Sequence, residues 1–580
     1  MTKNNPIIEC VPNFSEGRDM TIIKQITDAI ESVEGVCLLN VDPGEATNRT
    51  VVTFVGSPEA VVEAAFRGAK KAAEVIDMRK HHGAHPRMGA TDVLPLIPVS
   101  GITLEECALL ARQLAERMAN EVGIPCYAYE ASAFKPERKN LAVCRAGEYE
   151  ALQEKLTNPD RQPDFMPSLP TTGKGDDFQL PENILRSGIS VVGARDFLIA
   201  VNWNLNTTST RRANAIAFDV REKGRPKREG NPITGKPVMD ENGKPVMIPG
   251  TLKCTKAIGW YIDEYGIAQV SMNMTNLNVT PLHVAFDEVC RCAQNRGLRV
   301  TGTEIVGLVP KRALIDAGKY FLEKQHRSVG IPEEDIVKIA VKSMGLDDLK
   351  PFHPREKVIE YLLEDVAQAK AHARLTDLTT KAFAEETSRE SPAPGGGTVA
   401  AYMGALGAAL GTMVANLSAH KAGWDERWQE FSSWAEKGQA LMSELLALAD
   451  EDTEAFNQIM AAYGLPRKTD QEKAARAEAI EKATLHAAQV PLRTMKTGCQ
   501  VFDICKAMAS EGNPASVSDA GVGALAARAA VLGAGLNVRI NAASLKDRDM
   551  AARLSEEADV LAAEANTAEK TVMDIVANKI

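Results

Sequence analysis

The densest group of reactive side chains in the first half of the sequence is the segment HHGAHPRMG at residues 81–89. It holds three of the nine histidines, and its glycines and proline place it in a loop. An imidazole on such a loop titrates near neutral pH and suits general acid/base catalysis. Two rival interpretations stay open. In one, His82 and His85 bind a metal ion, although no carboxylate or thiolate has a convincing spacing; in the other, the histidines only satisfy turn backbone groups.

Asp42 and Arg49 flank the turn-forming residues between two strand-like runs, 36–41 and 50–55. Taken alone, such residues are most often a solvated turn residue and a surface cation. The planar guanidinium of Arg49 would also clamp a substrate carboxylate well. Both interpretations stay open at this point.

In the second half, Asp452 falls on an apolar helical stripe. Leu445, Ala449, Asp452, Phe456 and Ile459 are spaced by four, three, four and three residues, so they share one face of a helix. A carboxylate on a buried face is costly unless it is paired, and its pKa shifts toward values useful in proton transfer. We therefore predict a catalytic carboxyl here, with a structural aspartate bonded to helix termini as the alternative.

Two polar segments precede alanine-rich helices in the same half. SPAPGGG at 391–397 comes before an uncharged run, so free N–H groups at the start of that helix offer a site for an anion. The full phosphate-binding loop pattern, which ends in Gly-Lys-Ser/Thr, is missing from this segment. NPASVSD at 513–519 offers several polar groups, which helix capping alone also explains.

The elements that must position these residues differ between the two halves. The first part reads strand, helix, strand, strand, helix, strand up to Val99, and a similar order recurs later, with VVGARDFLIAVNWN as one strand. Beyond about Leu375, long helical periods dominate. The predicted fold class is multidomain: two α+β subdomains of the ferredoxin-like βαββαβ type, followed by an all-α helical domain.

The predicted domain boundaries follow these changes of pattern. An N-terminal subdomain covers 1–180, a second subdomain covers 181–330, a mixed linker covers 331–375, and the helical domain covers 376–580. Within the second subdomain, residues 223–250 are dense in Gly, Pro and charge. This stretch is predicted to be an extended surface loop.

Composition bounds the class of protein. The chain has 580 residues with 67 Lys+Arg and 77 Asp+Glu, a net charge of −10, 44% hydrophobic residues and 5% aromatics. This excludes a fully disordered or collagen-like protein and argues against nucleic acid as a main partner. The ten scattered cysteines include no C-x-x-C pair, and the N-terminus lacks the apolar run of a signal peptide. Reduced thiols and a cytoplasmic location are therefore expected.

Residues 398–419 carry no charge and have the length of a membrane span. Their apolar content is mainly Ala and Gly rather than the Leu, Ile and Phe that lipid favours. A tightly packed core helix is the predicted state. Gly404, Gly407 and Gly411 would let another backbone approach closely, at a helix crossing or a subunit contact.

Several longer segments, taken together, resemble one enzyme family. ECVPNFSEG, TNRTVVTFVG, HPRMGATDV, RAGEYEAL and GARDFLIAVN resemble the formiminotransferase half of the formimidoyltransferase-cyclodeaminase family. SPAPGGGTVAA, DEDTEAF and the Ser518-Asp519 segment resemble its cyclodeaminase half. The resemblance implies that the first half transfers a formimino group from N-formimino-L-glutamate to N5 of tetrahydrofolate, in histidine degradation. The second half then closes the ring to 5,10-methenyltetrahydrofolate and releases ammonia.

The resemblance also assigns residues by position. The histidine of HPRMGA, His85 here, is the implied acid/base of the transfer, whereas His81 and His82 precede the motif and inherit no role. The Asp of the D-x-E-A-F pattern, Asp452, is the implied proton donor and acceptor of the ring closure. The other implied positions are substrate contacts at Asp42, Arg49 and His283, folate contacts at Met166, Pro167, Ser168, Ser187 and Gly188, and a cyclodeaminase pocket of Ser391, Gly395, Gly396, Gly397, Ser518 and Asp519.

The implied partners are small molecules. N-formimino-L-glutamate and tetrahydrofolate, the latter with a polyglutamate tail, are the expected substrates; no metal, tightly bound cofactor, nucleic acid or membrane is expected. The family forms ring-like homo-oligomers built from dimers, and the same is expected here. The Lys- and Arg-rich stretch 223–236 is expected to be solvated, with contact to a polyglutamate tail as the alternative.

Two rival functions remain. The first is transfer alone, with the helical half serving as an oligomerisation or folate-binding module. The second comes from another class, a folate-binding or scaffold protein without chemistry. Both differ from the bifunctional enzyme in the products they release.

Overall fold

The protein is described by a computed structural model, which defines residues 6–45, 48–83, 86–168, 180–230, 235–370, 374–391 and 393–580. The chain divides into two compact units. The first is made of Met1–Ala313 and Met344–Ala367, and the second of Leu314–Ser343 and Gln368–Ile580. The first unit is α+β and the second is helical, which confirms the coarse fold class.

A seven-stranded sheet forms the N-terminal part of the α+β unit. In its order, β3-β4-β1/β2-β5-β7-β6, β1 and β2 are two segments of one interrupted strand that pairs with both β4 and β5. The pairings among β1 to β5 are antiparallel, whereas β5, β7 and β6 run parallel. The strands are β1 (Ile7–Cys10), β2 (Asn13–Phe14), β3 (Val36–Gly44), β4 (Arg49–Gly56), β5 (Thr91–Ser100), β6 (Cys126–Glu130) and β7 (Ser190–Ala194).

Apolar side chains cover both faces of this sheet. On one face, α1 (Met20–Glu31), α2 (Pro58–Val75) and α3 (Leu104–Arg117) form a core with alternate strand residues such as Leu94. Val93, which points to the opposite face, packs in a second cluster with side chains of α4 (Leu141–Arg145), α5 (Leu152–Thr157) and α6 (Glu182–Ser187). The start of β5 therefore lies between two packed layers.

A second, four-stranded sheet repeats the same order of elements. Strand, helix, strand, strand, helix, strand corresponds to β8, α7, β11, β12, α8 and β13, and the sheet order is β11-β12-β8-β13 with antiparallel neighbours. These elements are β8 (Ile199–Leu205), α7 (Thr210–Val220), β11 (Thr255–Ile262), β12 (Ile267–Met274), α8 (Leu282–Gln294) and β13 (Val300–Val306). The first sheet has this same order in its β3-β4-β1/β2-β5 part.

Two predictions about this region differ from the structure. The segment VVGARDFLIAVNWN forms two strands rather than one, because β7 belongs to the first sheet and β8 to the second. The predicted boundary at 180/181 therefore precedes the last strand of the first sheet. Residues 223–250 are also not a simple loop, since β9 (Arg225–Pro226) pairs antiparallel with β10 (Met247–Ile248).

Four helices occupy most of the predicted linker 331–375 and the residues before it. They are α9 (Lys311–Lys324), α10 (Glu333–Met344), α11 (Pro354–Lys357) and α12 (Ile359–Lys370). Leu322, Val329 and Ile336 form a small apolar cluster that joins α9 to α10. The structure places 314–343 in the helical unit and 344–367 in the α+β unit, so this stretch is divided between the two units.

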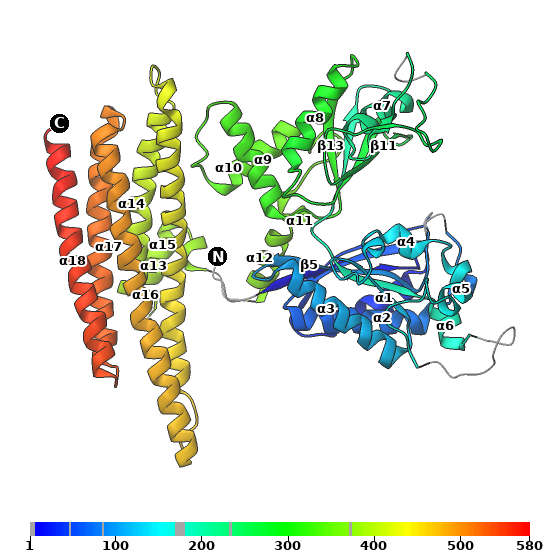
Figure 1. The fold of residues 1–580 in the computed structure, drawn as a ribbon. Helices are drawn as coiled ribbons and strands as arrows, with labels where there is room; N and C mark the ends of the chain where they lie inside the picture. Colours follow the sequence, from blue (N-terminus) through cyan, green and yellow to red (C-terminus); the bar gives the residue numbers. More distant parts are fainter. Residues whose placement is uncertain are drawn as a thin grey trace. The chain divides into compact units, whose positions relative to one another are not determined.

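Long helices dominate the second unit and lie side by side (Figure 1, yellow to red). They are α14 (Gly396–Ala419), α15 (Trp428–Tyr463), α16 (Asp470–Glu511), α17 (Val517–Ala543) and α18 (Arg548–Ala577), and the short helix α13 (Thr380–Thr387) precedes them. Small residues allow close packing: a Cβ on Gly407 would lie 2.7 Å from the carbonyl oxygen of Gly523. Gly396 lies against Asn537 instead, so α14 and α17 run antiparallel.

The uncharged helix α14 is the core helix that the sequence predicts. α14 and the segment Pro514–Ala543 are long and apolar enough to cross a membrane, and 61% and 50% of their most apolar windows are buried within the protein. Ala400, Ala408 and Ala415 of α14 are fully buried in the main apolar core of the helical unit. The glycines of α14 serve helix contacts within this core.

Candidate functional sites

Asp42 and Arg49 lie close together at the β3–β4 turn. Gly44 pairs with Arg49 across the two strands, and Asp42, two residues before Gly44 in β3, pairs with Val51. Asp42 is exposed and Arg49 is half-buried. Burial lowers the pKa of Arg49, and the nearby charges of Asp92, Arg145 and Asp42 also act on it. The structure therefore brings this predicted pair together, with a buried carboxylate and a second arginine beside it.

Asn48 anchors the first side of the histidine loop. Its side-chain Nδ2 donates to the carbonyl oxygen of His82 at 3.1 Å, and its Oδ1 accepts from the Gly17 N–H at 3.0 Å. Its own carbonyl oxygen lies 2.7 Å from His81 Nε2. Burial lowers the pKa of His81, because it disfavours the charged imidazolium.

Arg87 anchors the second side. It is largely buried, and its guanidinium donates to Glu148 Oε2 at 3.1 Å and to both carboxylate oxygens of Glu150 at 2.9 and 2.7 Å. Its carbonyl oxygen accepts from the Tyr149 N–H at 3.0 Å. Arg87 Nη2 also reaches the carbonyl oxygen of His81 at 3.4 Å, which ties the two sides of the loop together. The RAGEYEAL segment thus holds the HPRMGA segment.

Asp92 forms a third anchor beneath the loop. This fully buried carboxylate accepts from the Met88 N–H at 2.9 Å through Oδ1 and from Arg145 Nη2 through Oδ2. Lys155, also buried, donates to the Cys144 carbonyl oxygen at 3.0 Å, and burial lowers its pKa to about 8. His85 lies outside the described residues, but the residues on both sides of it, 81–82 and 87–89, are fixed by these contacts.

The predicted folate residues Ser187 and Gly188 lie against the end of this loop. The Ala90 N–H donates to the Ser187 carbonyl oxygen at 2.7 Å, and Gly188 forms an isolated β-bridge with Gly89. A Cβ on Gly188, whose φ is +69°, would lie 2.1 Å from the Met88 carbonyl oxygen. Only glycine fits this contact.

The remaining predicted contacts of the first site are more dispersed. Met166 packs against the apolar cluster that contains Met88, and Pro167 and Ser168 follow it in the chain. Residues 169–179, which continue this segment, lie outside the described residues. His283 is half-buried in the first turn of α8, beside the second sheet.

Asp452 belongs to α15, and its carboxyl lies against the first turn of α14, in the helical unit. Its Oδ2 accepts from Thr398 Oγ1 at 2.9 Å, and a hydrogen bond from the Thr398 backbone also reaches the carboxyl. Thr398 Oγ1 lies 3.0 Å from Thr453 Oγ1. A Cβ on Gly397 would lie 2.3 Å from Asp452 Oδ1, so the carboxyl sits where only glycine leaves room. The expected anion site at this helix start is thus filled by the protein's own aspartate.

Burial raises the pKa of Asp452, and the two hydrogen bonds from Thr398 lower it; the net direction is upward. The pKa of this carboxyl is therefore closer to neutral pH than the pKa of an exposed aspartate, which suits a group that both accepts and donates a proton. Its acidic neighbours have other partners: Asp450 accepts from Thr376 Oγ1 at 2.7 Å, and Glu451 pairs with Arg493 at 2.7 Å.

The predicted second pocket is only partly assembled within one chain. Gly397 lies against the Asp452 carboxyl, whereas Gly396, the residue before it, faces Asn537. Gly395 precedes α14, and Ser391 is exposed with its hydroxyl bonded to the Ala393 carbonyl oxygen at 2.7 Å. Ser518 and Asp519 lie in the first turn of α17. That turn is at the opposite end of α14, where the Asn513 N–H donates to Ser418 Oγ at 2.8 Å.

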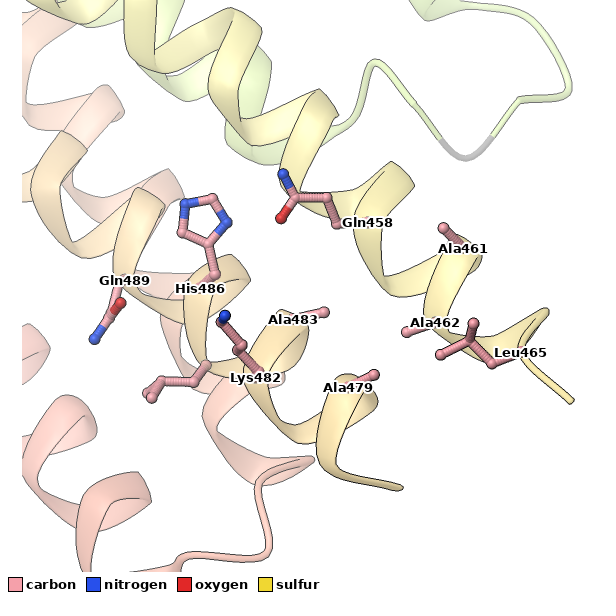
Figure 2. A pocket seen from close by; sticks show the side chains of 10 residues that line it. Gln458, Ala461, Ala462, Leu465, Ala479, Lys482, Ala483, His486 and Gln489 are labelled. Carbon is pink, nitrogen blue, oxygen red and sulfur yellow. The ribbon is translucent and has the colours of Figure 1, made fainter. Parts of the chain in front are cut away.

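Two concave regions lie away from these residues. A groove of about 610 Å³ runs between the ends of α15 and α16, with Gln458 from one helix and His486 from the other (Figure 2). A cleft of about 870 Å³ in the α+β unit is lined by residues that include Arg195, Lys256 and Asn276. Of the predicted site residues that the structure describes, none lines either region.

Among the residues that the structure defines, no group of three or more His, Cys, Asp or Glu side chains is placed to hold a metal ion. His82 is exposed on the loop, and its proposed metal partner His85 lies outside the defined part. The metal interpretation of the histidine loop therefore has no further support from the described residues.

Sequence reasoning missed the residues that hold the two sites. Asn48, Asp92, Arg145, Glu148 and Glu150 support the loop but are far apart in the chain. The signal for some of them was present, since RAGEYEAL was part of the resemblance although no contact was assigned to it. Thr398 follows the glycine triplet directly, and an N-terminal threonine on a buried helix is an ordinary partner for a carboxyl.

The two sites define a class of protein: an enzyme with one centre for acid/base chemistry in an α+β unit and another in a helical unit. Comparison with known families narrows the class. The model of the formiminotransferase domain, N-terminal subdomain, matches residues 7–179, that of the formiminotransferase domain matches 200–364, and that of formiminotransferase-cyclodeaminase matches 379–560.

Individual relatives agree with these matches. Formimidoyltransferase-cyclodeaminase of Rattus norvegicus is 40% identical over 541 residues, which cover 93% of each chain. Glutamate formimidoyltransferase of Streptococcus pyogenes serotype M1 is 40% identical over 55% of this chain and 93% of its own length. Methenyltetrahydrofolate cyclohydrolase of Methylorubrum extorquens is 39% identical over 35% of this chain and 97% of its own. The chain belongs to the formimidoyltransferase-cyclodeaminase family.

Proposed function

We propose that the protein is a bifunctional folate enzyme. Its first activity transfers the formimino group of N-formimino-L-glutamate to N5 of tetrahydrofolate, giving 5-formiminotetrahydrofolate and glutamate. Its second activity cyclises that product to 5,10-methenyltetrahydrofolate and releases ammonia. The observation that carries this proposal is that the chain matches, over nearly its whole length, relatives named for both activities. The anchored histidine loop and the buried Asp452 carboxyl, one in each unit, support it.

In the proposed transfer, N5 of tetrahydrofolate attacks the amidine carbon and loses its proton, while the departing glutamate nitrogen gains one. A single imidazole serves both proton transfers if it is held still between the two nitrogens. His85 is the proposed acid/base, and the contacts of Asn48, Arg87 and Asp92 support it because they hold His82, Arg87 and Met88, which lie before and after it in the chain.

The substrate contacts of the transfer are proposed from position and charge. Arg49 binds a carboxylate of formiminoglutamate, with Asp42 and His283 as further polar contacts. Met166, Pro167 and Ser168, together with Ser187 and Gly188, bind the folate. The contact of Ser187 and Gly188 with Gly89 and Ala90 supports this assignment, because Gly89 and Ala90 belong to the HPRMGA segment that carries the proposed acid/base.

In the proposed cyclisation, N10 attacks the formimino carbon and ammonia leaves. Asp452 takes the proton from N10 and returns a proton to the departing nitrogen. Its negative charge also stabilises the cationic amidinium carbon. Ser391, Gly395, Gly396 and Gly397 form the proposed pocket around it. Tetrahydrofolate, with its polyglutamate tail, is a cosubstrate, and neither step needs a metal, a nucleotide or a tightly bound cofactor.

We further propose that both sheets are of the ferredoxin-like βαββαβ type, which their shared strand order supports. The protein is proposed to act in the cytoplasm, in histidine degradation.

Self-association through the helical unit is supported by exposed apolar side chains that recur along α14 and α17, such as Leu406 and Met413, and Leu536 and Ile540. Light scattering on the full chain tests this association; Leu536→Asp with Ile540→Asp should dissociate it, and an unchanged mass would contradict the assignment.

Mixing the full chain with formiminoglutamate and tetrahydrofolate tests the function directly. The expected products are glutamate, ammonia and methenyltetrahydrofolate, the last detected by its absorbance. Asp452→Asn should release glutamate but little ammonia, and 5-formiminotetrahydrofolate should accumulate. His85→Ala should lose transfer yet still cyclise 5-formiminotetrahydrofolate that is supplied.

The rival functions give different products. A wild-type chain that releases glutamate but no ammonia would be a transferase whose helical unit only assembles the protein or binds folate. A chain that binds tetrahydrofolate without any product would be a binding or scaffold protein. Normal ammonia release by Asp452→Asn would remove that residue from its proposed role.

A further inference from the structure

The charged stretch 223–250, which the proposed reactions do not use, is described at residues 223–230 and 235–250, and these residues form a strap on the second sheet's subdomain. β9 pairs with β10, and the Lys227 N–H donates to the Val246 carbonyl oxygen at 2.7 Å. The Val238 N–H donates to the Lys227 carbonyl oxygen at 2.8 Å, and Arg228 forms a bridge with Pro237. Backbone hydrogen bonds therefore fix the position of the strap's basic residues.

The strap and α7 enclose a pocket of about 340 Å³. Arg211, Asn214 and Phe218 line it from α7, and Arg225, Pro226 and Arg228 line it from the strap. This volume is at the lower end of the range for small-ligand pockets. The lining carries three guanidinium groups and no carboxylate.

The pocket keeps an excess of positive charge. Arg225 pairs with Asp219 at 3.1 Å, but Asp219 also pairs with Arg296, so one carboxylate serves two arginines. Arg228 Nη1 donates to the neutral carbonyl oxygen of Gly235 at 2.7 Å. Within the described parts of the chain, no carboxylate forms an ion pair with Arg211 or Arg228. Converging like charges repel one another, and a bound anion would relieve this repulsion.

The walls of the pocket are held in place. Asn214 Nδ2 donates to the Gly259 carbonyl oxygen at 3.1 Å, and its Oδ1 accepts from the Gly259 N–H at 3.0 Å, which pins α7 to β11. The Arg221 guanidinium lies 4.0 Å from the centroid of the Phe218 ring and fixes the orientation of that ring. A preformed site loses less conformational entropy when a ligand binds.

We propose that this pocket, defined by Arg211, Arg225 and Arg228, binds a ligand with two or more oxyanion groups, either carboxylates or phosphates. Guanidinium forks match both groups with paired hydrogen bonds. Phe218 and Pro226 supply an apolar surface for the part of the ligand that links the anionic groups. The chain as a whole carries a net charge of −10, so only such a local cluster attracts an anion.

Two sources supply this chemistry. One is the γ-linked glutamate tail of the folate cosubstrate, in which case the pocket extends the proposed function; the other is a free phosphate compound. The two are distinguished by the probe, because tri-γ-glutamate carries only carboxylates and pyrophosphate carries only phosphates. Binding to the pocket requires neither reaction to proceed.

Isothermal titration calorimetry on the full chain at low salt, with tri-γ-glutamate and with pyrophosphate, tests the proposal. At least one probe should bind the wild type, and Arg211→Gln or Arg228→Gln should weaken it by about tenfold, the loss expected for one charge-assisted hydrogen bond. Arg212→Gln is the matched control: it removes the same charge from the next residue, whose guanidinium bonds the Arg296 carbonyl oxygen at 2.9 Å outside the pocket.

Failure of both probes to bind the wild type would overturn the proposal, and so would an equal loss in Arg212→Gln, because the effect would then be one of net charge. The two reactions, assayed with monoglutamyl folate, should be unchanged in Arg211→Gln. An inactive wild type that still binds a probe would contradict the proposed function alone, and an active wild type that binds neither would contradict the pocket alone.

Discussion

Thr398 Oγ1 donates a hydrogen bond to Asp452 Oδ2 at 2.9 Å, so the first turn of α14 and the carboxyl of α15 form one unit. The hydroxyl and the helix N-terminus favour the ionised carboxylate, whereas burial favours the protonated acid. The balance leaves the pKa of Asp452 raised. The residue that the helical stripe singled out is thus tuned by a residue from another helix.

Removing the Thr398 hydroxyl should shift the pH profile of ammonia release. In Thr398→Val the carboxylate loses a hydrogen bond that favours its charged form, so the pKa of Asp452 rises further. The ascending limb of kcat/KM for supplied 5-formiminotetrahydrofolate should move to higher pH, and the rate below the wild-type optimum should fall by about tenfold. Thr398→Ser keeps the hydroxyl and should restore the profile. An unshifted limb in Thr398→Val would separate Asp452 from the titrating step.

Asp452→Asn should stabilise the helical unit at neutral pH. Because the folded pKa lies above the ordinary value, the ionised carboxyl costs stability at pH values above that raised pKa, and the cost disappears as the pH falls through the raised pKa to the ordinary value. The melting temperature of Asp452→Asn should therefore exceed that of the wild type at neutral pH, and the difference should vanish in acid. A variant that melts lower at neutral pH would show that the carboxylate is a net stabilising partner.

Gly397→Ala should abolish cyclisation. The added Cβ would lie 2.3 Å from Asp452 Oδ1, so the carboxyl must move, and a displacement of about 1 Å costs on the order of 100-fold in rate. Gly533→Ala is the matched control, since its Cβ would have the Ala400 Cβ at 3.3 Å as its nearest neighbour and would not reach the Asp452 carboxyl. Glutamate release should stay normal in both. Equal ammonia release by the two variants would contradict the predicted geometry.

The anchors of the histidine loop give a prediction for the transfer. Glu148→Gln with Glu150→Gln removes both charges that hold Arg87 and should lower glutamate release by about 10- to 100-fold, because the loop's acid/base is no longer held in position. Glu154→Gln changes a carboxylate in the same segment that pairs with Arg161 instead, and should leave transfer intact. Cyclisation of supplied 5-formiminotetrahydrofolate should be unaffected in both the double variant and Glu154→Gln. A wild-type rate of transfer in the double variant would show that the ion pairs of Arg87 with Glu148 and Glu150 have no part in catalysis.

Local patterns explain how much of this architecture the sequence predicts. The spacing of Leu445, Ala449 and Asp452 records which side of a helix faces the core, and it located Asp452 correctly on the inner face. The order of strands and helices in the α+β unit was likewise visible. These are properties of residues close together in the chain.

The features that the sequence does not predict depend on pairing between residues that are far apart in the chain. Nothing local in VVGARDFLIAVNWN indicates that its first half joins β5 and β6 while its second half joins another sheet. Ser518 and Asp519 resembled pocket residues, but the antiparallel packing of α14 and α17 decides that they lie at the far end from Asp452 in the same chain. The partners Glu148 of Arg87 and Asp92 of Arg145 are likewise set by tertiary structure.

The division of the chain between its two units affects how the activities can be separated. The chain passes from one unit to the other after residues 313, 343 and 367. A single cut therefore leaves a piece of one unit covalently attached to the other, wherever it falls; a cut after residue 367 still leaves 314–343 attached to the α+β unit. To isolate the α+β unit, one must therefore remove residues 314–343 and rejoin the chain. Two complete proteins fused end to end would not have this arrangement, in which a segment of the helical unit lies within the sequence of the α+β unit.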